Sequence, residues 1–85
     1  MNDSVIVVFC NNATGQKCDV EIPTNISVKN LIIGLNEAFG LGIDVRNSSE
    51  LYLRTENPIG ILAGDIKVCD CNIYTGTEIC FDARK

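Results

Sequence analysis

The chain has 85 residues, of which 46% are hydrophobic and 21% are charged, and its formal net charge is −4. A chain of this length forms one domain, so we expect a single folded unit over residues 1–85. Its seven basic residues are scattered along the sequence, which argues against nucleic acid or an anionic membrane as the main partner because both need concentrated positive charge.

The N-terminal part of the chain has the pattern of a β-hairpin. Residues 4–10 are rich in β-branched and aromatic side chains, and residues 17–22 alternate polar with apolar ones, so both segments are predicted strands. The turn between them ends at Gly15, which can adopt a positive φ. The alternation puts Cys18 on the same face as Ile22, which predicts that Cys18 belongs to the core.

One amphipathic helix is predicted after the hairpin. Ser27 is a suitable N-cap and Gly40 a suitable C-cap, so the helix is expected over residues 28–39. Gly34 lowers the helix propensity in its middle. The apolar stripe of this helix consists of Val28, Leu31, Ile32, Leu35 and Phe39.

The rest of the chain is predicted to supply three more strands. Residues 50–54 alternate with their leucines inward, residues 61–62 form a short strand after a turn, and residues 77–81 form the last strand. The element order is therefore ββαβββ. One helix packed across one face of a mixed sheet would bury all of these apolar stripes, so we expect an α+β fold.

The side chains available for chemistry are five cysteines and no histidine. The chain looks cytosolic and the number of cysteines is odd, so we expect free thiols rather than a disulfide framework. Without histidine there is no ordinary general base near neutral pH, so we expect no catalytic residue and no enzyme. Cys69 and Cys71 form a Cys-x-Cys pair, but the second pair that is usual in zinc sites is missing. We therefore expect no metal site and no cofactor.

Several local sequences resemble ubiquitin-like proteins, and the resemblance extends over nearly the whole chain. Val68-Cys69-Asp70-Cys71-Asn72-Ile73 is similar to the ubiquitin segment Leu-Ser-Asp-Tyr-Asn-Ile, whose apolar ends enter the core. The helix opening at residues 28–32 and the ending at residues 70–79 resemble the EsaB/YukD group of bacterial ubiquitin-like proteins, although Thr77 stands where that group commonly has Asp. The resemblance implies a ubiquitin-like β-grasp fold.

The same resemblance implies an accessory or regulatory protein of a type VII (WXG100) secretion system. Such a protein would act in the cytoplasm, as a monomer or weak dimer, by binding a cytoplasmic part of the secretion machinery. The apolar run at residues 5–9 is too short for a signal peptide. The rest of the chain contains no apolar segment of greater length, so we expect no membrane insertion. The ending Ala83-Arg84-Lys85 lacks the Gly-Gly of conjugated relatives, so we expect no conjugation.

Four residues form a candidate interaction face. Cys10 and Cys80 point away from the helix by strand parity, and the implied fold places their strands side by side. The two thiols should therefore be neighbours on the open sheet face and accessible to a thiol reagent. Tyr52 and Arg54 point the same way and are of residue types enriched at interfaces. In the alternative interpretation, the cysteines serve a small thiol- or metal-handling protein, whose function would be abolished by replacing all five.

Overall fold

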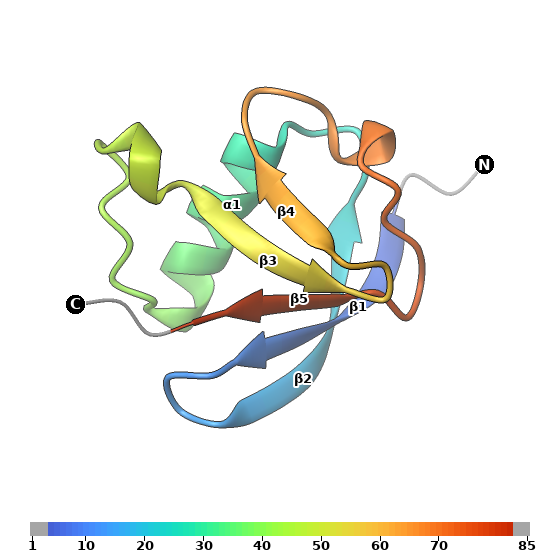
Figure 1. Cartoon of the computed structure of the whole chain (residues 1–85), viewed down its shortest axis with the longest axis horizontal. Helices are drawn as coiled ribbons and strands as arrows, with labels where there is room; N and C mark the ends of the chain where they lie inside the picture. The colour runs from blue at the N-terminus through green and yellow to red at the C-terminus, as the bar shows by residue number, and fades with distance from the viewer. Residues whose placement is uncertain (1–3, 83–85) are drawn as a thin grey trace.

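A computed structural model, which describes residues 4–82, shows a five-stranded sheet crossed on one face by a single helix (Figure 1). The elements in chain order are β1 (Ser4–Asn11), β2 (Gln16–Pro23), α1 (Val28–Phe39), η1 (Ser48–Glu50), β3 (Tyr52–Glu56), β4 (Gly60–Ala63), η2 (Val68–Asp70) and β5 (Glu78–Phe81). Here η denotes a short 3-10 helix. The order of the helix and strands is the predicted ββαβββ, and the α+β prediction is confirmed.

The sheet is mixed, as predicted, with strand order β2-β1-β5-β3-β4. The two neighbouring strands β1 and β5 run parallel, whereas β1–β2, β3–β4 and β3–β5 are antiparallel. The first and last strands of the chain therefore lie side by side in the interior of the sheet (Figure 1). Each has a neighbour on both edges, which fixes the position of the side chains on both of its faces.

Four of the five strands lie where the sequence predicts them, within one residue at each end. The predicted strand over residues 50–54 begins later than expected, at Tyr52. The reason is local: the Glu50 N–H donates to the carbonyl of Asn47 at 2.9 Å, and this bond closes a 3-10 turn before the chain becomes extended.

The helix α1 begins and ends at the predicted residues. The hydroxyl oxygen of Ser27 accepts a hydrogen bond from the Asn30 N–H at 3.1 Å, which satisfies one of the free donors of the first turn. Gly40 adopts the left-handed conformation with φ of 61°, and its N–H donates to the carbonyl of Asn36. Of the predicted stripe, all but Phe39 are buried.

The core lies between α1 and the sheet. At its centre Phe9 of β1 is 1% exposed, and its ring stacks on that of Phe39 with centroids 4.6 Å apart. Val68 is fully buried and Ile73 packs against the core, as the ubiquitin-like segment predicts. The buried apolar cluster comprises Val7, Phe9, Ile22, Val28, Leu31, Ile32, Leu35, Ile43, Leu51, Leu53, Leu62, Val68, Ile79 and Phe81.

The prediction that Cys18 belongs to the core is wrong. Cys18 has the expected parity, but its side chain is exposed. A shallow groove between β2 and α1 is lined by the Val20–Pro23 part of the strand and by Gly34 of the helix, among others. Cys18 lies beyond this groove towards the hairpin turn, so the helix leaves it uncovered. Parity determined its face correctly but could not determine how far the helix extends over an edge strand.

Gly34→Ala is expected to stabilise the protein by about 0.5–1 kcal/mol, because alanine has a higher helix propensity and a less flexible unfolded state. Apart from its chain neighbours and the backbone of its own helix, a Cβ atom at this position would meet no atom within 4 Å. The matched control is Gly40→Ala, which forces a side chain into the left-handed region and is expected to cost about 1–2 kcal/mol. Urea denaturation followed by circular dichroism measures the free energy of unfolding of both variants. If both variants change it in the same direction, the helical conformation of Gly34 or the left-handed conformation of Gly40 is contradicted.

None of the helices in the described part of the chain is long and apolar enough to cross a membrane. The expectation about conjugation depends on residues 83–85, which lie outside the described residues.

Candidate interaction face

The sheet face opposite α1 carries the four residues predicted as an interaction face. We call this surface the open face. Its side chains follow from the strand register, in which Cys10 pairs with Cys80, Arg54 with both Cys80 and Ile61, and Glu56 with Glu78. The open face comprises Ile6, Val8, Cys10, Tyr52, Arg54, Glu56, Ile61, Glu78 and Cys80, none of which belongs to the buried cluster under the helix.

Cys10 and Cys80 are direct partners across the parallel β1–β5 pair, so the prediction that they are neighbours is confirmed. The expectation that they are accessible is wrong, since Cys10 is 2% exposed and Cys80 is 4% exposed. Both lie on interior strands, and longer side chains around them, including Arg54 and Glu78, cover the small thiols. Burial on this face is therefore compatible with the predicted parity.

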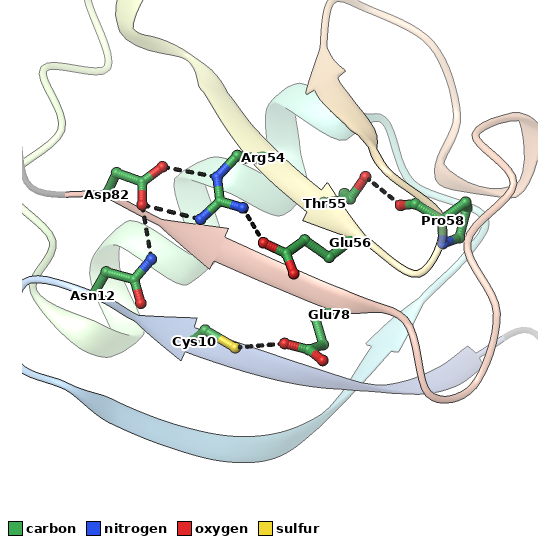
Figure 2. A network of polar contacts seen from close by, with 8 residues as sticks. All are labelled: Cys10, Asn12, Arg54, Thr55, Glu56, Pro58, Glu78 and Asp82. Carbon is green, nitrogen blue, oxygen red and sulfur yellow. Dashed lines mark hydrogen bonds and ion pairs between the residues drawn. The ribbon is translucent and has the colours of Figure 1, made fainter.

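The Cys10 thiol is held in its neutral form. Its Sγ donates to Oε1 of Glu78 at 3.4 Å (Figure 2). Burial, the hydrogen bond to Glu78 and the proximity of Cys80 raise the pKa of Cys10 to about 12. A thiol with this pKa is protonated at neutral pH and is a poor nucleophile. Catalysis by Cys10 therefore has no support from its surroundings.

Arg54 organises the polar part of the open face (Figure 2). Its Nε and Nη2 donate to the two carboxylate oxygens of Asp82 at 3.0 and 3.2 Å, and its Nη1 pairs with Glu56. Asn12 donates to the same Asp82 carboxylate at 2.7 Å. The hydrogen bonds to Asp82 and then to Glu56 hold the pKa of Arg54 above its ordinary value. The guanidinium is thus fixed in place over the middle of the sheet.

Apolar side chains lie on both sides of this polar centre. Ile6 of β1 is 49% exposed, and on the other side Tyr52 of β3 and Ile61 of β4 are 41% and 63% exposed. A surface with a fixed arginine and exposed aromatic and aliphatic groups has the composition that is enriched at protein–protein interfaces.

Two carboxylates of this site were missed by sequence reasoning. Glu78 lies beside Cys10, and Asp82 holds Arg54. Both share the parity of Cys80 in and after β5, so the same alternation that placed Cys80 on the open face could have placed them there. Their partners could not be identified in this way, because Cys10 and Glu78 are 68 positions apart in the sequence.

The Cys-x-Cys pair does not become part of a larger cluster. Cys69 is exposed, and Cys71 is half-buried with its Sγ 3.3 Å from the Lys67 carbonyl oxygen. Burial and then the negative charge of Asp70 raise the pKa of the Cys71 thiol. Within residues 4–82, the one group of three potential metal ligands consists of Cys10, Glu78 and Cys80.

A thiol reagent is expected to distinguish the cysteines by their burial. In the folded protein the exposed Cys18 and Cys69 should react first and Cys71 more slowly, whereas Cys10 and Cys80 should react only after unfolding. Peptide mass spectrometry at successive times of labelling, with and without denaturant, measures the order. Fast labelling of Cys10 or Cys80 in the folded protein would contradict the burial of these two thiols beneath the side chains of the open face.

Comparison with known proteins identifies a family. The sequence profile described as "WXG100 protein secretion system (Wss), protein YukD" matches residues 5–80, which include every strand of the sheet in whole or in large part. A comparison with curated proteins finds no significant match.

The similar solved structures have the ubiquitin fold. A de novo designed protein based on ubiquitin has a TM-score of 0.68 at 17% identity, over 99% of this chain and 93% of that chain. The ubiquitin-like domain of an Arabidopsis thaliana protein has a TM-score of 0.62 at 14% identity, over 93% and 76%. A chain in the crystal structure of a pParkin–pUb–UbcH7 complex has a TM-score of 0.66 at 14% identity, over 93% of this chain but only 22% of its own length. These likenesses establish the ubiquitin-like β-grasp fold.

Proposed function

The chain belongs to the YukD family of the WXG100 protein secretion system (Wss), and from this membership we propose that it is a cytoplasmic accessory or regulatory protein of such a system. It acts by binding a cytoplasmic portion of the secretion machinery rather than by catalysis. Fold alone does not determine function, so the proposal depends on the family and on the surface that the fold presents.

The observation that carries the mode of action is the composition of the open face. Arg54 is fixed by Asp82 and Glu56, and exposed Tyr52 and Ile61 lie next to it in the register of β3 and β4. Fixed arginines and exposed aromatic side chains lose little conformational entropy on binding, which is why they dominate binding energy at interfaces. We propose that Tyr52 and Arg54 contact the partner, and that Cys10 and Cys80 lie buried beneath this contact and do not touch the partner.

Secretion by the host tests the role in the system. The gene is deleted, and the small secreted WXG100 proteins in the medium are quantified by mass spectrometry. We expect a marked change in their amounts that the wild-type gene restores. An unchanged set of secreted proteins would overturn the proposed role.

The contact surface is tested by complementing the deletion with variants. Tyr52→Ala/Ile61→Ala removes exposed apolar area from the open face with little effect on folding, and it is expected to fail to restore secretion. The matched control is Ile66→Ala, an isoleucine that is 50% exposed in the connection beside the start of α1. If the double variant restores secretion as well as the control does, the open face is not the contact surface.

A second candidate function, thiol or metal handling, is favoured by one observation, which is the grouping of Cys10, Glu78 and Cys80. A chain in which the two buried cysteines are replaced by alanine and the other three by serine separates the two candidates. Restored secretion with this chain supports the interaction role, and lost secretion with a normally folded chain supports the cysteine-based role.

A further inference from the structure

Three potential metal ligands meet at the centre of the open face. Cys10 and Cys80 are direct partners in the parallel register, and Glu78 lies two residues before Cys80 on the same face of β5. The two Sγ atoms and a carboxylate oxygen all lie within 4.8 Å of one another. Figure 2 shows the Cys10 thiol and the Glu78 carboxylate pointing towards each other between β1 and β5. No loop has to move to bring these ligands together.

The spacing of the ligands fits a tetrahedral ion. Zinc lies about 2.3 Å from a thiolate sulfur and about 2.1 Å from a carboxylate oxygen, so a tetrahedral angle separates sulfur from oxygen by about 3.6 Å and two sulfurs by about 3.8 Å. The Cys10 Sγ and Glu78 Oε1 are 3.4 Å apart. The other pairs of ligand atoms lie within 4.8 Å of each other, so they need to approach by at most about 1 Å.

The chemistry of the three ligands selects a thiophilic cation. Two thiolates and one carboxylate bring a charge of −3, and soft sulfur ligands favour Zn²⁺ over the oxygen-seeking Mg²⁺ and Ca²⁺. A divalent ion leaves a charge of −1 on the site. The Arg54 guanidinium lies close enough to Cys80 to interact with it electrostatically, and it shares its positive charge with Asp82 and Glu56.

We propose that Cys10, Glu78 and Cys80 form a binding site for a thiophilic divalent cation of the Zn²⁺ class, with the fourth coordination position left to water. Each thiol proton is released to solvent as its sulfur binds the ion, and no change of oxidation state is involved. Cation binding of this kind does not depend on the proposed role in secretion.

The sequence analysis placed Cys10 and Cys80 side by side but did not identify them as a metal site, because zinc sites are recognised from closely spaced cysteine pairs. The pair with such spacing, Cys69 and Cys71, has no third ligand among the described residues. Cys10 and Cys80, which do have a third ligand in Glu78, lie near the two ends of the chain. Only the parallel β1–β5 pairing brings them together. The sequence-based expectation of no metal site is therefore replaced by a proposal that the fold supplies.

Cobalt titration tests the proposal on the full chain, freed of metal by a chelator and kept reduced by a phosphine. Co²⁺ alone is the probe, because sulfur-to-cobalt charge transfer in the near ultraviolet reports thiolate ligation, and visible ligand-field bands report tetrahedral geometry. We expect one Co²⁺ per chain, displaced by Zn²⁺ with loss of both spectral features. The absence of a charge-transfer band in the wild-type chain would overturn the proposal.

Variants assign the ligands. Cys10→Ala/Cys80→Ala is expected to lose the charge-transfer band, and Glu78→Gln is expected to weaken cobalt binding by more than about tenfold. Cys69→Ser/Cys71→Ser is the matched control and should bind as the wild type does. Glu78→Gln alters a half-buried side chain only, so it keeps the test decisive if the double alanine variant fails to fold. Unchanged binding by Glu78→Gln, or loss of binding by the control, would overturn the assignment.

Discussion

Phe9→Ala is expected to lower the free energy of unfolding by about 3–5 kcal/mol, the usual cost of truncating a buried phenylalanine. Phe9 is 1% exposed and lies on an interior strand. In the strand register it is paired with Cys18 of β2 on one side and with Ile79 of β5 on the other. Neither neighbouring strand can move to fill the cavity without breaking its own ladder. Small domains are stable by only about 5–15 kcal/mol, so this variant should be close to unfolding at room temperature.

The control for this prediction is the other ring of the stacked pair. Phe39→Ala removes the same aromatic contact but truncates a side chain that is 36% exposed. Its expected cost is about 1–2 kcal/mol, most of it from the ring pair. Chemical denaturation of both variants and of the double variant measures the losses and the coupling between the rings. Equal losses in the two single variants would contradict the placement of Phe9 at the centre of the core.

Helix α1 could be predicted to the residue because its signals are local. The Ser27 cap, the apolar stripe and the left-handed Gly40 all lie within one short segment, and the two caps form hydrogen bonds to residues three or four positions away. The strands were placed nearly as well by their alternation. The exception at residues 50–54 arose from a hydrogen bond between Asn47 and Glu50 that side-chain alternation does not report.

The candidate site was only partly predictable, because it depends on contacts between distant segments. Strand parity assigned Cys10 and Cys80 to the correct face, and the ubiquitin-like resemblance placed their strands together. Neither signal indicates how far neighbouring side chains cover a residue. The two thiols were therefore expected to be accessible, although the structure buries them. The role of Glu78 could not be seen at all, since it exists only across the β1–β5 pairing.

Thr77→Val is expected to lower the free energy of unfolding by about 1–3 kcal/mol, because it leaves the partly buried Tyr74 N–H without its acceptor. Thr77 is 1% exposed and precedes β5. Its Oγ1 accepts from the Tyr74 N–H at 3.0 Å, and its own N–H donates to the Tyr74 carbonyl at 3.0 Å. Valine keeps the shape of the side chain and removes only the accepting oxygen, so the loss measures that bond.

Thr77→Ser is the matched control, since it keeps the oxygen and removes one methyl group, at a cost of about 0.8 kcal/mol. A valine variant as stable as the serine variant would show that the hydrogen bond to Tyr74 is dispensable. The same bond explains why threonine is compatible with a position where the EsaB/YukD group commonly has aspartate. Threonine carries its oxygen acceptor on Cβ and aspartate on Cγ, so both present an acceptor close to the backbone, and the turn before β5 requires an acceptor there rather than a negative charge. At this position the accepting oxygen is what the fold needs, and either residue supplies it.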